Sequence, residues 1–351
     1  MQEDKDYGLS RPGVLAALSA ALLFGAGTPL AKLLLNTVDP WLLAGLLYLG
    51  SGFGLTVYRY LRHASPVHLR RNEVLWFVGA ILAGGVAGPV LLMAGLAGMR
   101  ASEASLLLNA ESVFTALLAW FVFKENFDFR IALGMGSIVL GAVALSWPGE
   151  AQLEEMTPTL AVLGACLAWA IDNNLTRKVA FADATWIASV KGLVAGCVNL
   201  MLAFALGASM PKAASLAGGL IVGLLAYGVS LSLFVLGLRH LGTARTGAYF
   251  AIAPFFGAML AVLMGEPITL PLMLAGALMA LGTWLHLTEQ HVHEHFHEAT
   301  EHDHEHVHDE HHQHTHDHPV PPGTKHSHRH RHEPRIHSHP HYPDIHHRHE
   351  H

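Results

Sequence analysis

The sequence is poor in charge and in cysteine. Only 14% of the 351 residues are Asp, Glu, Lys or Arg, whereas 52% are hydrophobic and 34 are glycine. Soluble domains carry roughly a quarter of their residues as charged ones, so this composition argues against a soluble enzyme. The two cysteines, Cys166 and Cys197, both lie in apolar runs. They indicate neither a disulfide framework nor a cysteine-based zinc site.

Long apolar runs occupy the first 290 residues. A membrane-crossing helix needs roughly 20 apolar residues, and ten such runs follow one another along the chain. They cover residues 13–35, 38–58, 74–96, 101–123, 127–147, 159–178, 184–206, 216–238, 243–264 and 268–288. The first run is too long, and its start too weakly basic, for a cleaved signal peptide. We therefore predict an all-α integral membrane protein with ten transmembrane helices.

Lys and Arg are unevenly divided between the two sets of connecting loops. If residues 1–12 lie in the cytoplasm, twelve Lys and Arg fall on the inner side, and only Lys32, Arg100 and Lys212 fall on the outer side. Because cytoplasmic loops carry an excess of positive charge, we expect a protein of the cytoplasmic (inner) membrane with both termini in the cytoplasm. The oligomeric state stays open.

The ten runs divide into two halves, residues 13–147 and 159–288, joined by an external linker at 148–158. Each half has five runs, so the halves start on opposite sides of the bilayer. At an offset of 145 residues Lys32 meets Arg177, and at an offset of 141 Glu125 meets Glu266. These matches favour two inverted five-helix repeats. Such halves can rock about a central cavity, which is typical of transporters.

Two segments carry a resemblance to a known family. RASEASLLLNAESVFTALLAWFVFKE (residues 100–125) and TARTGAYFAIAPFFGAMLAVLMGE (residues 243–266) resemble the EamA-type drug/metabolite transporters. The second segment ends in the family's Gly-Glu pair, whereas the first has Lys124 and Glu125. The resemblance covers residues 10–288 and implies secondary transport of small metabolites, often export, through a central cavity. It does not name a substrate.

Charged side chains inside the sixth and seventh runs are the first candidates for a binding site, because a charge at mid-bilayer is costly. At about 1.5 Å per residue, Asp172 and Lys191 lie at matching depths, so we predict that they face one another. They form an ion pair, which either fixes helix packing or binds substrate or a proton. Asn173 and Asn174 extend this polar patch. It matches Gly25–Pro29 of the first run, which predicts interrupted helices in both halves.

Glu111 lies near the middle of the fourth run and is a candidate proton carrier. The alternative is a protonated Glu111 that only hydrogen-bonds to a neighbouring backbone. Asn109 belongs to a polar stripe with Ser102, Ser105 and Ser112 on another face of that helix. Tyr249 in the ninth run is a further candidate, either lining a cavity or anchoring the helix at the interface. For Glu125 and Glu266, at helix ends, we favour a structural role.

Histidine is concentrated in a tail, residues 289–351. From His291 onward this tail holds 24 of the 28 His and the whole net charge of −6. This segment predicts a disordered cytoplasmic tail, or at most a helical extension before Pro319. Neutral imidazoles bind Zn, Ni, Co and Cu. The candidate metal ligands are His291, His293, His295, His297, His302, His304, His306, His308, His311, His312, His314, His316 and His318.

The function we predict is secondary transport of a small polar metabolite by alternating access. We expect the transport to be coupled to protons and its direction to be export. We expect no enzyme activity, no required cofactor and no nucleic-acid partner. The partners are the lipid bilayer, a small solute and transition-metal ions. The main alternative is a divalent-metal transporter whose tail collects or senses the metal. A metal-sensing receptor that transports nothing is a third possibility.

Overall fold

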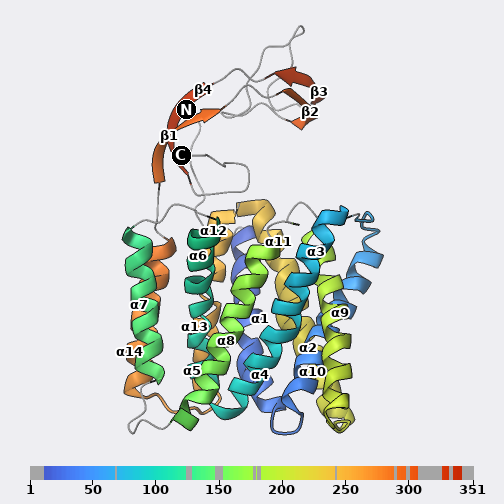
Figure 1. The fold of residues 1–351 in the computed structure, drawn as a ribbon, viewed down its shortest axis with the longest axis vertical. Helices are drawn as coiled ribbons and strands as arrows, with labels where there is room; N and C mark the ends of the chain where they lie inside the picture. The colour runs from blue at the N-terminus through green and yellow to red at the C-terminus, as the bar shows by residue number, and fades with distance from the viewer. Residues whose placement is uncertain are drawn as a thin grey trace. The chain divides into compact units, whose positions relative to one another are not determined.

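The structure is a computed structural model that describes residues 12–67, 69–123, 129–146, 153–176, 179, 183–241, 243–287 and four short tail segments. Residues 12–287 form a helical body (Figure 1). Its first part consists of α1 (Pro12–Leu34), α2 (Pro40–Leu61), α3 (Arg71–Ala80), η1 (Ile81–Ala87), α4 (Gly88–Gly98), α5 (Ala101–Leu107), α6 (Ala110–Phe123) and α7 (Phe129–Ser146). Its second part consists of α8 (Leu153–Thr176), α9 (Ala184–Ala205), α10 (Ala213–Gly223), η3 (Leu224–Val229), α11 (Ser230–Leu241), α12 (Thr243–Phe250), α13 (Ala253–Leu263) and α14 (Leu270–Leu287).

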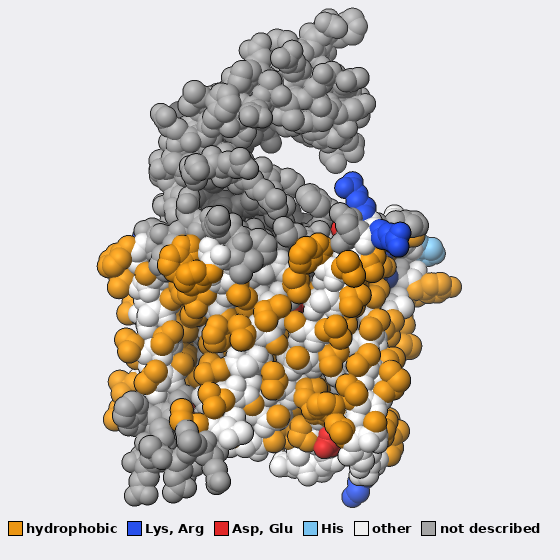
Figure 2. Space-filling model, viewed as in Figure 1, with side chains coloured by type: hydrophobic (Ala, Val, Ile, Leu, Met, Phe, Trp, Pro, Cys, Tyr) orange, Lys and Arg blue, Asp and Glu red, His pale blue; other side chains and the backbone are white. Residues whose placement is uncertain are grey.

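The surface of the helical body is apolar. Five helical runs are long and apolar enough to cross a membrane: Pro12–Leu34, Pro40–Leu61, Glu73–Gly98, Ala184–Ala205 and Ala213–Gly237. Large hydrophobic side chains cover the visible face of the helices (Figure 2), and Phe53, Leu75 and Leu140 are at least 60% exposed. A soluble protein does not expose apolar surface on this scale. The body is therefore that of a multi-pass integral membrane protein.

The helix breaks do not lie where the sequence predicted them. The first and sixth runs were expected to be interrupted, but α1 and α8 are continuous. The fourth and ninth runs break instead, at residues 108–109 and 251–252. The third and eighth runs each contain a π-helical segment, η1 and η3, which begin 143 residues apart. Helix α8 also begins at Leu153, inside the range predicted as an external linker.

Pro29 lies inside α1 without breaking it. A proline at this position removes the donor for the carbonyl of Gly25, four residues earlier. That oxygen faces Gly257 of α13, where a Cβ would come within 2.7 Å of it. Because both positions are glycines, α1 and α13 approach closely enough to cover the free carbonyl. Helix α1 therefore continues through Pro29 with this carbonyl packed against α13.

The two parts of the body exchange their first helices. Helix α1 packs mainly against α11 and α13, whereas α8 packs against α4, α6 and η1. The remaining pairs also cross between the parts: α2 lies along α9, and α7 lies along α14 at one edge of the bundle (Figure 1). Reciprocal packing of this kind is what two inverted repeats would produce.

Glycines make the α2 contacts possible. Gly52 of α2 and Gly192 of α9 face each other, with the Gly192 Cβ position 2.6 Å from the Gly52 Cα. On the α10 side, Gly50 faces the carbonyl of Leu220, and Gly223 faces the carbonyl of Leu47. Small residues let helix backbones approach where lipid supplies no hydrophobic drive. A side chain at any of these positions would force the helices apart.

The tail forms a separate unit from Glu289 onward. Its four segments are strands β1 (His291–His297), β2 (Glu301–His306), β3 (His326–Arg331) and β4 (Arg335–His341). They pair as two antiparallel ladders, β1 with β4 and β2 with β3. This differs from the predicted disorder or helix. The alternation of His with other residues has the period of two that suits a strand.

Candidate functional site

The predicted contact between Asp172 and Lys191 is present. Lys191 Nζ, on α9, donates to both carboxylate oxygens of Asp172, on α8, at 2.6 and 2.7 Å. Thr176, one turn along α8, donates its hydroxyl to Asp172 Oδ1 at 2.9 Å. The side chains of Lys191 and Asp172 are only 15% and 9% exposed. An ion pair buried this far is costly to desolvate and depends on its hydrogen bonds.

Helix η1 closes one side of this pair. Gly84 packs so tightly against Asp172 that a Cβ at that position would overlap the carboxylate. The carbonyl of Gly84 accepts hydrogen bonds from Tyr48 Oη at 2.7 Å and from Trp169 Nε1 at 2.9 Å. The carbonyl of Gly85 accepts from Asn199 Nδ2 at 3.0 Å. Side chains from α2, α8 and α9 thus converge on the backbone of η1.

The π-helical geometry explains why the carbonyl of Gly84 has no donor within its own helix and can accept hydrogen bonds from side chains. The N–H of Gly88 donates to Ala83, five residues earlier, and not to Gly84. Pro89 has no N–H to give, so the carbonyl of Gly84 has neither an α-helical nor a π-helical donor. These contacts were not predicted from the sequence. The combination of Gly84, Gly85 and Gly88 with Pro89 was the signal that could have revealed them.

Glu111 and Asn173 form a second polar contact beside the ion pair. Asn173 Nδ2, on α8, donates to Glu111 Oε1, on α6, at 2.8 Å. Asn173 directly follows Asp172 in α8, so this contact adjoins the ion pair. Asn174 is buried, and its Nδ2 donates to the carbonyl of Ala170 at 2.9 Å. Four of the seven predicted site residues, Asp172, Lys191, Asn173 and Glu111, thus form two neighbouring polar pairs. Among the described residues, Asn174 bonds only within α8 and to the carbonyl of Thr115 on α6 at 3.5 Å.

Asn109 and Tyr249 are not part of this group. Asn109 occupies the break between α5 and α6, where its Nδ2 donates to the carbonyl of Leu106 at 2.8 Å. Its Oδ1 accepts from Thr283 of α14 at 3.3 Å. Within the described residues, Asn109 thus bonds to α5 and α14 and to neither member of the ion pair. Tyr249 is half-buried on α12, and no bond within the described residues joins it to Asp172 or Glu111.

Aromatic side chains continue from Tyr48 into the second part of the body. The rings of Tyr48 and Tyr227, on η3, lie 5.7 Å apart, and Phe24 of α1 lies 5.7 Å from Tyr227. Phe250 of α12 follows at 5.2 Å from Phe24. Tyr48 therefore connects the two π-helical segments, because its hydroxyl binds η1 and its ring packs on η3.

Glu266 joins two helices at the opposite end of the body from the loop between α2 and α3. Its carboxylate accepts from the N–H groups of Ala101 and Ser102 at 2.8 and 2.9 Å, which caps the start of α5. Partial burial raises the pKa of Glu266, but hydrogen bonds from Ser102 and Ala101 and the charge of Arg100 outweigh it and lower the pKa below its ordinary value. These contacts agree with the structural role we favoured. Glu125, its partner in the repeat, lies outside the described residues.

Lys32 of α1 binds the turn between α4 and α5 at the end of α4. Its Nζ donates to the carbonyls of Leu96 and Ala97, at the end of α4, at 2.6 and 3.1 Å. A cation at a helix C-terminus and a carboxylate at a helix N-terminus each oppose the helix dipole. The α4–α5 turn is thus clamped by α1 and by the segment after α13.

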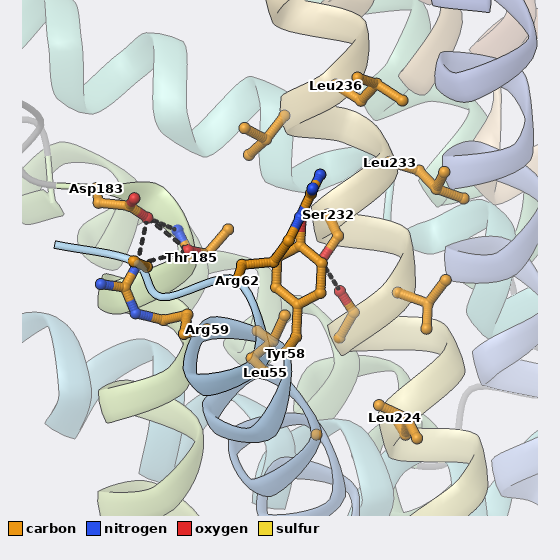
Figure 3. A pocket seen from close by; sticks show the side chains of 15 residues that line it. Leu55, Tyr58, Arg59, Arg62, Asp183, Thr185, Leu224, Ser232, Leu233 and Leu236 are labelled. Carbon is orange, nitrogen blue, oxygen red and sulfur yellow. Dashed lines mark hydrogen bonds and ion pairs between the residues drawn. The ribbon is translucent and has the colours of Figure 1, made fainter.

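A separate pocket of about 560 Å³ lies between α2, η3 and α11 (Figure 3). Arg59 at its edge forms an ion pair with Asp183 at 2.9 Å and donates to Thr185 Oγ1 at 2.8 Å. None of the predicted site residues lines this pocket.

The predicted metal ligands are divided by the structure. His291, His293, His295 and His297 lie on β1, and His302, His304 and His306 lie on β2. The other six, His308, His311, His312, His314, His316 and His318, lie outside the described residues. Among the side chains that the structure does describe, no three His, Cys, Asp or Glu come together to hold a metal ion.

Known proteins resemble this chain over the helical body. It is 27% identical over 292 residues to an "Uncharacterized transporter" of Methanothermobacter thermautotrophicus, covering 78% of this chain and 85% of that protein. It is 30% identical over 175 residues to a "Probable amino-acid metabolite efflux pump" of Salmonella typhimurium, covering 49% of this chain and 55% of that protein. The Escherichia coli protein of the same name is 27% identical over 172 residues, with the same coverage.

The fold also matches a solved crystal structure with a TM-score of 0.60 at 19% identity, covering 78% of this chain and 95% of that one. The sequence profile described as "EamA-like transporter family" matches residues 11–147 and 156–288, so each half of the body matches it once. The protein is thus a membrane transporter of small solutes and not an enzyme. The chain belongs to the EamA-like transporter family.

Proposed function

We propose that this transporter exports a small zwitterionic metabolite of the amino-acid type. The observation that carries the proposal is the buried ion pair of Asp172 and Lys191, packed against η1. A zwitterion can replace this pair charge for charge, with its carboxylate on Lys191 and its ammonium on Asp172. Exchange of partners leaves neither charge unpaired, which limits the cost of binding inside the membrane. The names of the Salmonella and E. coli relatives support this class of solute.

We further propose that ten helices cross the cytoplasmic membrane as two inverted halves, with both termini inside. Support comes from the reciprocal packing of α1 and α8 and from the repeated pattern of a π-helical third run and a broken fourth run. Two halves of opposite orientation can expose the site to either side in turn. Tyr48, which contacts both π-helical segments, lies where the halves would move against each other.

Proton coupling is proposed for Glu111. One oxygen of its carboxyl group accepts a hydrogen bond from the Asn173 amide, and this contact adjoins the ion pair. A carboxyl group in such a place gains or loses a proton according to its access to water and to the neighbouring charges. Protonation of Glu111 would therefore alter the balance of charge at the site.

The histidine tail is proposed to bind divalent transition metals. The strand register pairs His293 with His339 and His295 with His337, and in the other ladder it pairs His304 with His328. Alternate residues of a strand share a face, so each ladder carries a row of paired histidines. Imidazole suits Zn, Ni, Co and Cu. Metal as the transported cargo has less support, because the described part of the membrane body holds no cluster of ligands for it.

The central test is exchange of radiolabelled amino acids by the purified protein in liposomes. Asp172→Asn and Lys191→Ala should each reduce exchange to the level of empty liposomes, because each leaves one buried charge without its partner. Asp183→Asn is the control, since it removes an ion pair of similar length at the edge of the body. The charge-swapped double variant, Asp172→Lys with Lys191→Asp, restores the pair but reverses its direction.

Exchange at wild-type rates in both single variants would contradict the proposed site. If the swapped variant transports as the wild type does, the pair has only a structural role.

A further inference from the structure

The pocket of Figure 3 begins where the close contact between α2 and η3 ends. Gly50 and Gly54 bring α2 against Leu220 and Leu224. One turn later α2 carries Tyr58, Arg59 and Arg62, whose size keeps α11 at a distance. The helices therefore diverge toward the end of α2 and leave a groove of about 560 Å³.

The wall of the groove is apolar along the helices. Leu55, Leu224, Leu233 and Leu236 line it. Leu236 is 39% exposed and Tyr58 is 41% exposed, so the groove opens on the outer surface of the body. That surface is the apolar one that contacts lipid. A hydrocarbon chain can lie in such a groove without meeting water.

The end of the groove is polar and carries a net positive charge. The charge of Arg59 is balanced by Asp183, and its Nη2 also donates to the carbonyl of Ser65 at 3.0 Å. Arg62 is exposed, and its guanidinium carbon lies 5.9 Å from the centre of the Tyr58 ring. Figure 3 shows Arg62 and Tyr58 between the Arg59–Asp183 pair and α11. Within the described part of the chain, no carboxylate forms an ion pair with Arg62.

We propose that this groove binds an anionic phospholipid. The phosphate of the headgroup binds Arg62, beside Tyr58, and one acyl chain lies along Leu224, Leu233 and Leu236. Basic groups at the membrane surface attract anionic headgroups, and tyrosine is favoured at the level of the headgroups. A free phosphate ion would leave the apolar wall without an occupant. The bound lipid fills the space between α2 and α11 and stabilises this end of the body.

The test uses the full chain purified in detergent, with native mass spectrometry to count bound lipid and thermal unfolding to measure stability. Phosphatidylglycerol, phosphatidylcholine and inorganic phosphate are added in separate arms. In the wild type, phosphatidylglycerol should bind more tightly than phosphatidylcholine and should raise the melting temperature further. Arg62→Gln should weaken phosphatidylglycerol binding about fivefold, since a surface arginine contributes about 1 kcal/mol to anionic lipid binding.

Two further variants separate charge from shape. Arg71→Gln, at the start of α3, removes one exposed arginine outside the groove and should leave binding unchanged. Leu233→Trp fills the groove without changing charge and should reduce binding of phosphatidylglycerol while the protein stays folded.

Equal binding of the two lipids by the wild type would overturn the proposal, as would an Arg62→Gln variant that binds as the wild type does. Stabilisation by inorganic phosphate equal to that by phosphatidylglycerol would show an anion site in place of a lipid site, and would also overturn it.

Discussion

Gly84 shows how a single missing side chain permits the charged site. Replacement by alanine places a Cβ on the Asp172 carboxylate, so either η1 shifts or the ion pair opens. Overpacking of this kind costs about 1 to 3 kcal/mol. We expect Gly84→Ala to lower the melting temperature and to impair exchange. Gly136→Ala on α7 is the matched control, because nothing lies within 4 Å of its Cβ position.

If Gly84→Ala unfolds at the wild-type temperature and exchanges solute at the wild-type rate, the tight contact between η1 and Asp172 is not required.

Glu111 provides the test of proton coupling. Glu111→Gln keeps an oxygen for the amide of Asn173 but cannot take up or release a proton. The pH dependence of solute exchange should therefore disappear, while exchange at the optimal pH continues. Rates are compared across pH in liposomes, with Glu103→Gln as a control carboxylate at the start of α5. A variant with the wild-type pH profile would show that Glu111 is not the coupling group.

At this scale the sequence predicted contacts better than orientations. Asp172 and Lys191 could be paired because consecutive antiparallel helices place residues at equal depth from their shared loop. Asn109 was placed on another face than Glu111 without a predicted partner, because the run of apolar residues does not reveal the break at residues 108–109, where Asn109 bonds to Thr283 of α14. Depth along a helix follows from counting residues, whereas rotation about the axis depends on local irregularities.

At the scale of elements, the clamp on the α4–α5 turn is the feature that can be tested. Glu266→Ala removes the acceptor for the N–H groups of Ala101 and Ser102, and loss of such a cap costs about 1 kcal/mol. The pKa of Glu266 is lowered in the folded protein, so its charge stabilises the fold above the unfolded pKa. That contribution is lost as the pH falls through the folded pKa.

The melting temperatures of wild type and Glu266→Ala should therefore differ at neutral pH and converge at acidic pH. A gap between wild type and Glu266→Ala that is constant with pH would contradict the ionic cap.

The elements themselves were largely predictable. Each apolar run coincides with a helix or a series of helices. In lipid a segment of about twenty apolar residues must satisfy its own backbone hydrogen bonds, and a helix does so. The π-helical segments were not predicted, and in η1 the carbonyls of Gly84 and Gly85 accept hydrogen bonds from side chains of three other helices. Helix α1 continues past Pro29 where it packs closely against Gly257, which is more than 220 residues away in the sequence.

At the scale of the whole molecule, the membrane body and the tail separate in both sequence and structure. Deletion of residues 289–351 should leave amino-acid exchange unchanged and abolish binding of zinc and nickel. Binding is measured by calorimetry on the full chain and the truncated chain. Deletion of residues 342–351 alone, which removes four histidines but no strand, should retain most of the metal sites.

Loss of amino-acid exchange in the long truncation, or metal binding that survives it, would count against separate roles for the two units. Loss of metal tolerance in cells together with intact exchange would assign the tail to metal handling alone.

The division into two halves was visible in the sequence as two sets of five apolar runs, and the family profile matches each half once. The exchange of α1 and α8 between the halves was not visible there, since helix packing partners leave no mark in composition or periodicity. The strands of the tail were missed for a different reason. A segment dense in His and acidic residues cannot form a core, which predicts disorder. The alternation of His with other residues, in contrast, has the period of two that suits paired strands.

The reciprocal placement of α1 and α8 imposes an order on biosynthesis. Helix α1 leaves the ribosome first, but α11 and α13 are synthesised about two hundred residues later. Until then α1 has few protein neighbours, and the small side chains of its packing face meet acyl chains. A truncated product that ends after residue 147 would lack both the partners of α1 and the helix that fills its own interior. Neither half is therefore a natural unit for separate expression, and ribosome pausing between them would leave an intermediate exposed to membrane proteases.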